Sequence, residues 1–375
     1  MSIPLHVLYF RSRTPECPKY VRALEPLGYM VKRGHRITDM ESLVQPDGTL
    51  AWEAVEGALA QCNVLLVTNV DVTPPIMDLF MRMVEYCRQH RKLMVFDTDD
   101  CYPEVPDTNP LREHTLPWEF LQKVVLQCHA VTVTGTVLQK VMSLYHRHVF
   151  VLPNMIDFSK YPMRPRSHER LRVGWMGGAT HLADLPIVAE AVRNLRRKYI
   201  FDFVLGGFPH HFSQVAKLVR LHGLLPEDLK RRLEQDAVAL IHHLHDISCE
   251  VGIAVPYEQF PAALAAMDLD IGLCPIRDTL FNRCRSAIKF YQYAAVGTVA
   301  VASNIYPYSD EPVLLAENTV GDWEKALEPL LLDKAAREKT ACAQRDYVLR
   351  NRNYELNGMM WELLYQRLLE VLQKA

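Results

Sequence analysis

Short aliphatic runs alternate along the first 153 residues with segments in which apolar residues recur every three or four positions. Such runs are typical of parallel strands buried on both faces, and the segments between them have the period of amphipathic helices. The pattern therefore predicts strand–helix–strand units in a doubly wound sheet. The expected strands are Leu5–Phe10, Val64–Thr68, Leu93–Asp97, Ala130–Thr134 and Val149–Pro153, and the expected helices are Pro18–Leu27, Pro75–His90, Trp118–Cys128 and Thr136–Tyr145.

The alternation starts again after a polar, proline-containing stretch that extends from Pro153 to His168. We therefore expect an α/β protein with two doubly wound, Rossmann-like domains that face each other across a cleft. The second sheet is expected to contain Leu171–Met176, Phe201–Leu205, Ala239–His243, Ile271–Cys274, Val299–Ser303 and Val313–Leu315, with helices at Leu185–Tyr199, Gln259–Met267 and Ser286–Val296.

The two domains are predicted to span residues 1–156 and 157–348. The tail from Asp322 onward is helical in pattern, and we expect residues 349–375 to form a helix that packs back on the N-terminal domain. Because open α/β sheets bind ligands beyond the carboxyl ends of their strands, a small-molecule or nucleotide site is expected in the cleft.

Composition narrows the class of protein. The formal net charge of −2 provides no overall positive potential that would attract nucleic acid or an anionic membrane. No run of 18 apolar residues is present, so no membrane-spanning helix is expected. Arg11 and Arg13 follow the first apolar run where a signal peptide would have small residues, so that run is interpreted as a strand. The nine cysteines are scattered and form no Cys-x-x-Cys pair, which argues against a disulfide framework or a zinc site. We expect a cytoplasmic protein.

A glycine turn at Gly177 and Gly178 ends the first strand of the second domain. Thr180 could cap the following helix, whose free N–H groups would form an anion site, and His181 closes the motif. A plain strand-to-helix turn is the alternative interpretation. The chain contains neither a dinucleotide Gly-x-Gly-x-x-Gly nor a P-loop Gly-Lys-Ser/Thr.

A second motif is the basic helix that Ser286 would cap and Gly297 would end. Arg285, Lys289 and Gln292 have the spacing of one helix face. Two cations and an amide near a helix N-terminus suit a diphosphate and the hydroxyls of a ribose. The alternative is a solvated basic face.

Three carboxylates, Asp97, Asp99 and Asp100, follow a strand of the first domain. At the carboxyl end of a strand they could bind a metal, act as a general base, or order the loop as capping groups. The histidines of the chain do not show the His-Glu-x-x-His spacing of zinc enzymes, so a zinc site is not supported. No Gly-x-Ser-x-Gly elbow is present, so a nucleophilic triad is not supported either.

Several of these stretches resemble the retaining GT-B glycosyltransferases, in the large group that includes sucrose-phosphate synthases and lipopolysaccharide mannosyltransferases. The resemblance is most specific in Leu269–Pro275, Asn282–Gly297 and Val299–Ser303, and extends to Val149–Asp157 and Gly174–Leu182. In the first domain it is weaker, and depends on Tyr20–Arg22, the Asp97–Asp100 cluster and Ala130–Thr134.

The resemblance implies transfer of a sugar from a nucleotide-diphosphate donor held mainly by the second domain. Because the donor would occupy the strand ends of that domain, the acceptor is expected against the first domain. Gly177, Gly178 and Thr180 match the phosphate-side turn, and Arg285 and Lys289 match cations that face the diphosphate. With them, His181, Ser286 and Gln292 complete the candidate donor residues. The three aspartates are the catalytic candidates, Arg11 and Arg13 the candidate acceptor residues, and no metal or other cofactor is expected.

Two positions depart from the family pattern. Cys284 and Gln292 stand where the family often has two glutamates, the second of which holds the donor ribose, and the frequent catalytic histidine of the first domain is replaced by Asp97 or Asp99. A catalytically inactive nucleotide-sugar-binding subunit and a nucleotide-sugar epimerase are therefore alternatives to a transferase. The acceptor could be a surface glycan, a small metabolite or a hydroxymethylated DNA base.

Overall fold

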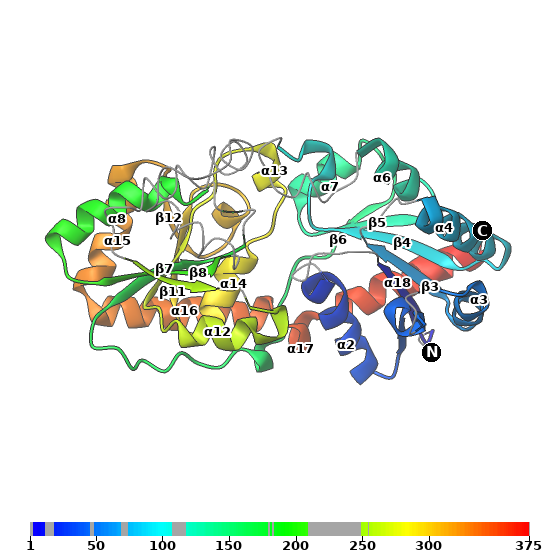
Figure 1. The fold of residues 1–375 in the computed structure, drawn as a ribbon, viewed down its shortest axis with the longest axis horizontal. Helices are drawn as coiled ribbons and strands as arrows, with labels where there is room; N and C mark the ends of the chain where they lie inside the picture. Colours follow the sequence, from blue (N-terminus) through cyan, green and yellow to red (C-terminus); the bar gives the residue numbers. More distant parts are fainter. Residues whose placement is uncertain are drawn as a thin grey trace, which may run out of the picture.

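A computed structural model of the chain describes residues 3–11, 19–45, 49–68, 74–106, 118–178, 181, 184–208, 249–253 and 255–374. Its strands form two separate parallel sheets, which lie in the two halves of an elongated molecule (Figure 1). The predicted fold class of two doubly wound domains followed by C-terminal helices is confirmed.

The first sheet has six strands in the order β2-β1-β3-β4-β5-β6. All neighbours are parallel, and the chain changes direction across the sheet between β1 and β3, whose carboxyl ends therefore form a topological switch point. The strands are β1 (His6–Arg11), β2 (Arg36–Asp39), β3 (Val64–Thr68), β4 (Leu93–Thr98), β5 (Ala130–Val133) and β6 (Val149–Val151).

The second sheet also has six parallel strands, in the order β12-β11-β10-β7-β8-β9. Its switch point lies between β7 and β10, where the glycine turn follows β7. The strands are β7 (Arg172–Met176), β8 (Asp202–Phe208), β9 (Cys249–Ile253), β10 (Ile271–Cys274), β11 (Val299–Ser303) and β12 (Leu314–Ala316).

Helices cover both faces of each sheet. In the first half they are η1 (Lys19–Leu24), α2 (Glu25–Lys32), η2 (Met40–Leu43), α3 (Trp52–Gln61), α4 (Pro74–Gln89), η3 (Tyr102–Glu104), α6 (Trp118–Val125) and α7 (Thr136–Met142). In the second half they are η4 (Phe158–Lys160), α8 (Pro186–Lys198), η6 (Tyr257–Gln259), α12 (Phe260–Ala266), α13 (Leu280–Arg283), α14 (Ile288–Ala295) and η7 (Tyr308–Asp310). The C-terminal helices are α15 (Val320–Leu332), α16 (Lys334–Asn351), α17 (Tyr354–Asn357) and α18 (Met359–Lys374).

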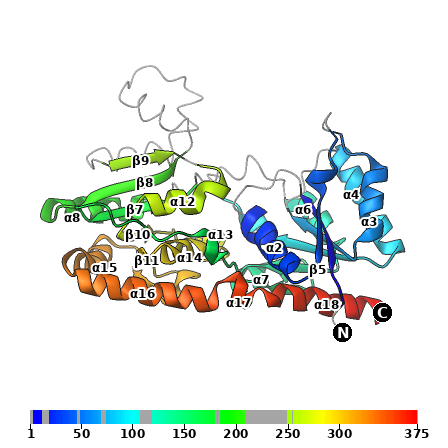
Figure 2. The same ribbon diagram turned by 90° about the horizontal axis from the view of Figure 1, so that it is seen from below.

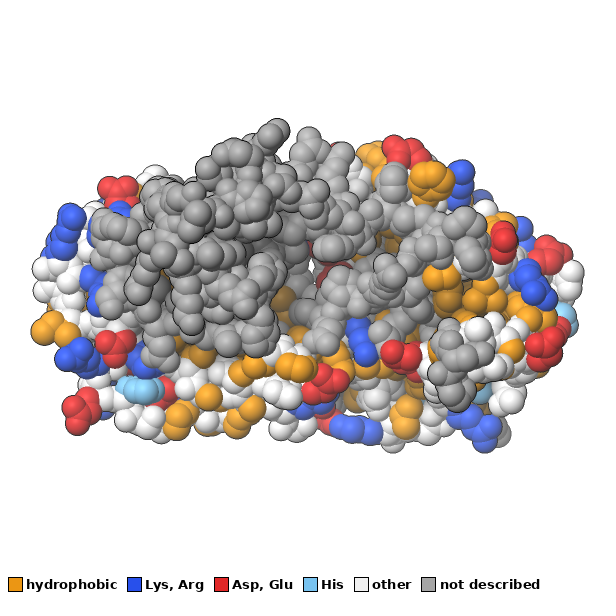
Figure 3. Space-filling view, viewed as in Figure 1, with side chains coloured by type: hydrophobic (Ala, Val, Ile, Leu, Met, Phe, Trp, Pro, Cys, Tyr) orange, Lys and Arg blue, Asp and Glu red, His pale blue; other side chains and the backbone are white. Residues whose placement is uncertain are grey.

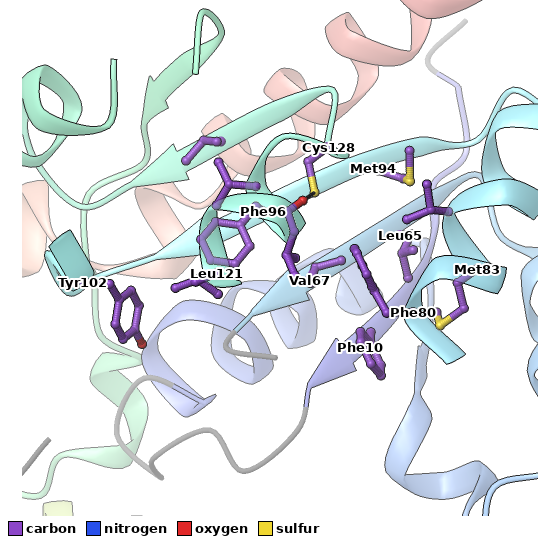
Figure 4. Close-up of a cluster of buried hydrophobic side chains, with 14 of the residues drawn as sticks. Phe10, Leu65, Val67, Phe80, Met83, Met94, Phe96, Tyr102, Leu121 and Cys128 are labelled. Carbon is purple, nitrogen blue, oxygen red and sulfur yellow. Dashed lines mark hydrogen bonds between the residues drawn. The ribbon is translucent and has the colours of Figure 1, made fainter. Parts of the chain in front are cut away.

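The core on one face of the first sheet is built where α3, α4, α6 and α7 pack against the strands (Figure 4). Phe10, Phe80 and Phe96 are buried there, and the rings of Phe10 and Phe80 stack with centroids 6.1 Å apart. Two residues of the second half, Phe281 and Cys284, belong to the same buried cluster. The hydrophobic core of the first domain therefore continues into the second.

The opposite face of the first sheet is covered by α2 and by the last helix of the chain. Trp361, Tyr365 and Leu369 of α18 are buried against Leu5 and Val7 of the N-terminal strand segment. Figure 2 shows α16, α17 and α18 in succession along one side of the molecule, from the second half to the first. The C-terminal helix thus packs on the N-terminal sheet, whereas the exact domain limits, at 156 and 348, stay predictions.

Some elements differ from the sequence-based expectation. The polar edge strand β2 and the helix α3 were not predicted. The helix expected at Pro18–Leu27 is divided into η1 and α2, and α2 continues beyond Leu27 to Lys32. The predicted strand Ala239–His243 lies outside the described residues, and β9 begins at Cys249 instead. The tail is helical from Val320 onward, without a further strand in its described part, as predicted.

Candidate active site

The carboxylate of Asp97, at the end of β4, is completely buried. Its oxygens accept hydrogen bonds from Arg22 Nε and Nη2, at 3.0 and 2.6 Å, and from Thr132 Oγ1 at 2.6 Å. Arg22 also donates to the Leu152 carbonyl and to Asn154 Oδ1. A carboxylate enclosed by three donors cannot reach an acceptor hydroxyl, so the structure argues against the predicted catalytic role of Asp97 and indicates a structural one.

Asp99 lies two residues farther along, half-buried, and makes no hydrogen bond or ion pair with another described residue. Burial, together with the neighbouring charges of Asp100 and Asp97, raises the pKa of Asp99 to about 7. Arg22 and Arg285 act in the opposite direction on that pKa. Asp99 thus combines a carboxylate that has no partner among the described residues with a pKa near neutrality, as a general base requires.

Asp100 faces the second domain. Its Oδ1 lies 3.4 Å from Arg285 Nη2, and both side chains are largely buried. The pair joins a predicted catalytic residue to a predicted donor-binding residue. Figure 3 shows acidic side chains in red near the middle of the face viewed, between the two halves.

On the other side of this junction, Gly177 follows β7 in a space too small for any side chain. A Cβ on Gly177 would lie 2.5 Å from a ring carbon of Trp175 and 2.9 Å from Lys289 Nζ. Gly178 has open space around it. The turn therefore brings backbone close to a lysine. Helix α8 begins at Pro186, and His181 and Asp184, which lie between the turn and α8, have 3-10 helical conformation. Thr180 lies outside the described residues.

Lys289 is the most unusual charge in this region. Its side chain is only 9 % exposed, its Nζ lies 4.4 Å from the centroid of the Trp175 ring, and no hydrogen bond or ion pair joins that nitrogen to another described residue. Burial lowers the pKa of Lys289 to about 8; Arg285 acts in the same direction, and the carboxylate of Asp184 acts in the opposite one. A buried ammonium that has no ion pair among the described residues is costly, and its position beside Gly177 makes it a candidate site for an anion.

Arg285 is held by a neutral histidine. Its Nη1 donates to His181 Nε2 at 2.5 Å, and its guanidinium lies over the Phe281 ring with 5.0 Å between the guanidinium carbon and the centroid. Burial and the charges of Arg285 and Lys289 lower the pKa of His181 to about 3. Because His181 is neutral, its other ring nitrogen can donate to Asp184, at 3.3 Å from Oδ2.

Asp184 is a residue that the sequence analysis missed. Although it is buried, hydrogen bonds from His181 and the Arg277 backbone N–H lower its pKa. Asn282 Nδ2 also donates to it, at 3.3 Å. The signal in the sequence was the His181–Asp184 spacing, one helical turn apart, although its partners at 277 and 282 come from another part of the chain.

The predicted capping role of Ser286 is wrong. Helix α14 begins at Ile288 with Ala287 at its N-cap and no side-chain cap, whereas Ser286 Oγ accepts a hydrogen bond from Asn154 Nδ2 at 2.7 Å. The Ser286 side chain therefore forms a hydrogen bond between the two domains instead of capping a helix. Gly297 follows the helix with φ +80, as expected of a glycine that ends a helix.

Gln292 and Cys284, which stand where the family often has two glutamates, lie in different surroundings. Gln292 is buried, and its Nε2 lies 3.5 Å from Tyr257 Oη. Cys284 is fully buried and hydrogen-bonded to Cys101 of the first domain, an interaction that, with burial, raises the pKa of the Cys101 thiol. Cys284 therefore contacts the first domain, where it is shielded from a ligand.

The acceptor candidates are less well placed. Arg11 ends β1, at the switch point of the first sheet, but the structure describes only its backbone, and Arg13 lies outside the described residues.

In the part of the chain that is described, no three His, Cys, Asp or Glu side chains form a group that could hold a metal ion. None of the described helices combines the length and apolar character that a bilayer crossing requires.

Comparisons with known proteins identify the fold. No protein-family model matches the chain, and no curated protein matches it in sequence. Among solved structures, an alpha-glucosyltransferase in complex with UDP-glucose and DNA containing an abasic site matches with a TM-score of 0.67 and 10% identity over 96% of this chain and 100% of that one. A glycosyltransferase from Rickettsia africae ESF-5 matches with a TM-score of 0.65 and 11% identity, over 98% and 99%.

The catalytic domain of starch synthase IV from Arabidopsis thaliana, bound to ADP and acarbose, matches with a TM-score of 0.63 and 10% identity over 98% of this chain and 100% of that one. All three matches span both sheets and the C-terminal helices, because they cover nearly the whole chain. The chain therefore has the GT-B fold.

Proposed function

We propose that this chain is a glycosyltransferase that moves a sugar from a nucleoside diphosphate donor to an acceptor hydroxyl, with retention of configuration. The observation that carries the proposal is the buried ammonium of Lys289, which forms no hydrogen bond or ion pair with another described residue and lies beside the glycine turn at the switch point of the second sheet. Similarity of fold to glycosyltransferases supports the reaction class.

In this proposal, Lys289 and Arg285 stabilise the negative charge that develops on the departing diphosphate. Both cations are held in place before the reaction, Lys289 against the Trp175 ring and Arg285 by His181 and Phe281. Cations that are already oriented need no reorganisation when the bond to the sugar breaks, which is the basis of electrostatic catalysis. Gly177 allows the phosphates to approach the backbone.

Asp99 is proposed to orient the acceptor hydroxyl and to take its proton. With a pKa raised to about 7, about half of its carboxyl groups are ionised at neutral pH, where a base is most effective. The acceptor would lie on the first-domain side, toward Arg11 and Arg13. A glycan, a small metabolite and a hydroxymethylated DNA base are the acceptor classes to test.

A nucleotide-sugar-binding protein without transferase activity is a second candidate, favoured by one observation. Cys284, at a position where the family often has a glutamate, is buried in the hydrophobic cluster of the first domain. The donor sugar would therefore lack an acidic contact from this position.

Titration calorimetry with UDP, ADP and GDP tests the site. We expect saturable binding of at least one of them, weakened by about 1.5–3 kcal/mol in Lys289→Ala, the contribution of a charge-assisted hydrogen bond. Lys339→Ala, which removes an exposed lysine of α16, is the matched control and should bind as the wild type does. Equal affinities of Lys289→Ala and the wild type would contradict the site assignment.

Assays of hydrolysis and transfer with a panel of nucleotide sugars then separate the two candidates. A transferase should release the nucleoside diphosphate and form a glycoside whose anomeric configuration, measured by NMR, matches that of the donor. Binding without turnover on every donor and acceptor class would support the inactive subunit. A product of inverted configuration would refute the proposed retention but not the proposed transferase activity.

A further inference from the structure

Asp184 is only 2% exposed and connects two separate segments of the second domain. Its Oδ1 accepts hydrogen bonds from the Arg277 backbone N–H at 2.9 Å and from Asn282 Nδ2 at 3.3 Å, both in the segment that follows β10. Its Oδ2 lies 3.3 Å from His181 Nδ1, just after the glycine turn. The carboxylate therefore joins the segment after β10 to the histidine that contacts Arg285.

The two oxygens of Asp184 face different kinds of partner. Both groups at Oδ1 are fixed donors, because one is a backbone N–H and the other, Asn282 Nδ2, also donates to the Arg277 carbonyl at 2.9 Å. The partner at Oδ2 is a neutral imidazole, whose two ring nitrogens can exchange the roles of donor and acceptor.

Asp184 thereby selects one tautomer of His181. Although burial acts in the opposite direction, the hydrogen bond with His181 lowers the pKa of Asp184, so the carboxylate is ionised at neutral pH. An ionised carboxylate accepts hydrogen bonds and donates none, so its Oδ2 favours the form of His181 that carries the proton on Nδ1.

The tautomer of His181 decides how Arg285 is held. Arg285 Nη1 lies closer to His181 Nε2, at 2.5 Å, than to Nδ1, at 3.1 Å. With the proton on Nδ1, the lone pair of Nε2 accepts a hydrogen bond from the guanidinium. With the proton on Nε2, two N–H groups would oppose each other, and the guanidinium would have to move.

We propose that Asp184 is a positioning residue, which holds His181 in the Nδ1–H form and thereby keeps the Arg285 guanidinium in place for a diphosphate. The last step rests on the function proposed above. A guanidinium that His181 no longer held would still have Asp100 of the first domain as a partner, since Asp100 Oδ1 lies 3.4 Å from Arg285 Nη2. That carboxylate would then compete with a bound anion for the cation.

The direct electrostatic effect of Asp184 has the opposite sign to its positioning effect. Burial lowers the pKa of Lys289, and the carboxylate of Asp184 acts in the opposite direction, as a nearby negative charge does. By Coulomb's law alone, removal of this negative charge should strengthen the binding of an anion. Weaker binding after its removal would therefore show that the orientation of Arg285 outweighs the change in charge.

The isosteric variant Asp184→Asn tests the tautomer. Its amide oxygen should stay where the two fixed donors meet it, so that its NH₂ group faces His181 Nδ1 and the ring proton moves to Nε2. ¹⁵N NMR of the whole chain, labelled at histidine, distinguishes protonated from unprotonated ring nitrogens, and His181→Ala identifies the signals of His181. We expect the Nδ1–H form in the wild type and the Nε2–H form in Asp184→Asn.

Calorimetry with UDP, ADP and GDP measures the consequence for the site. Asp184→Asn should bind whichever of them the wild type binds about 10-fold more weakly, the loss expected when one charge-assisted hydrogen bond is misplaced. Asp346→Asn, which removes an exposed carboxylate of α16, is the matched control and should bind as the wild type does. In a His181→Ala background, Asp184→Asn should not weaken binding further, because Asp184 acts through His181.

The proposal is overturned by a wild-type His181 protonated on Nε2, by an unchanged tautomer in Asp184→Asn, by equal or tighter nucleotide binding in that variant, or by equal weakening in the His181→Ala background. If Asp184→Asn does not fold, the wild-type spectrum still decides the tautomer, and His181→Ala should itself bind about 10-fold more weakly. If the wild type binds none of the three nucleotides, the proposed function is contradicted, whereas the two spectra still decide whether Asp184 sets the tautomer of His181.

Discussion

Replacing Lys289 with methionine should stabilise the ligand-free protein while it weakens binding of nucleoside diphosphates. Burial lowers the pKa of Lys289 from 10.5 to about 8. This difference corresponds to about 3 kcal/mol by which the buried charge destabilises the fold at neutral pH. Loss of the contact between Nζ and the Trp175 ring offsets about 1 kcal/mol of the gain. The expected net stabilisation is about 2 kcal/mol.

The effect should depend on pH in a defined direction. Below pH 8, Lys289 is protonated in the folded and unfolded chain alike, so the full cost is present. Between about pH 8 and 10.5, the unfolded chain keeps the proton and the folded chain does not, and the stability of the wild type therefore rises with pH across this window. Lys289→Met lacks this dependence, so the two proteins should converge toward pH 10.5.

Differential scanning calorimetry measures both features. For a chain of 375 residues, 2 kcal/mol corresponds to a rise in Tm of roughly 2–3 °C at pH 7. Lys339→Met, on the exposed face of α16, should leave Tm nearly unchanged. A lower Tm for Lys289→Met at pH 7 would show that an anion within the protein already compensates the ammonium. The reasoning that leads from this lysine to a diphosphate would then be wrong.

The remaining predictions concern both sides of the junction. Asp99→Asn should lower kcat more than donor affinity, and in the wild type kcat should fall as pH drops below about 7, where Asp99 becomes protonated; a pH–rate profile checks both. Asp97→Asn should instead lower the free energy of unfolding by about 3–5 kcal/mol, measured by denaturant titration, because the guanidinium of Arg22 remains buried without its partner. Activity should survive EDTA, since two cations would face the diphosphate in the proposed site; loss of transfer that Mn²⁺ restores would make the aspartates metal ligands. Phe281→Ala should destabilise the protein by about 3–5 kcal/mol in thermal unfolding, although the residue lies between domains, because its ring is buried in the first core.

The fold could be predicted because most of its strands are buried on both faces. A run such as Leu93–Phe96 is apolar throughout, since helices cover it from both sides, and that pattern is visible without any tertiary information. The strand β2 could not be found in this way. Arg36–Asp39 forms an edge of the sheet and is polar, so its pairing with β1 follows from the tertiary arrangement alone.

The site was predicted in part, and the limits are physical. The cations Arg285 and Lys289 were found because their spacing in the sequence is that of one helix face. In the structure Arg285 precedes α14, which begins at Ile288, so the two do not share a helix. The burial of Lys289 depends on Trp175, more than a hundred residues away. The sequence alone could not separate Asp97 from Asp99. Which carboxylate is neutralised depends on Arg22, 75 residues earlier, so the catalytic candidate emerges only from the fold.

The packing of α18 on the first sheet has a consequence for how the protein is made. The strands of that sheet end at Val151, yet the helix that buries Leu5 and Val7 begins at Met359, 208 positions later. At about 5–20 residues per second, the ribosome needs roughly 10–40 s to supply it. Throughout that interval, the N-terminal sheet exists with one apolar face incomplete, so the nascent chain should be a substrate for chaperones until its last helix has emerged.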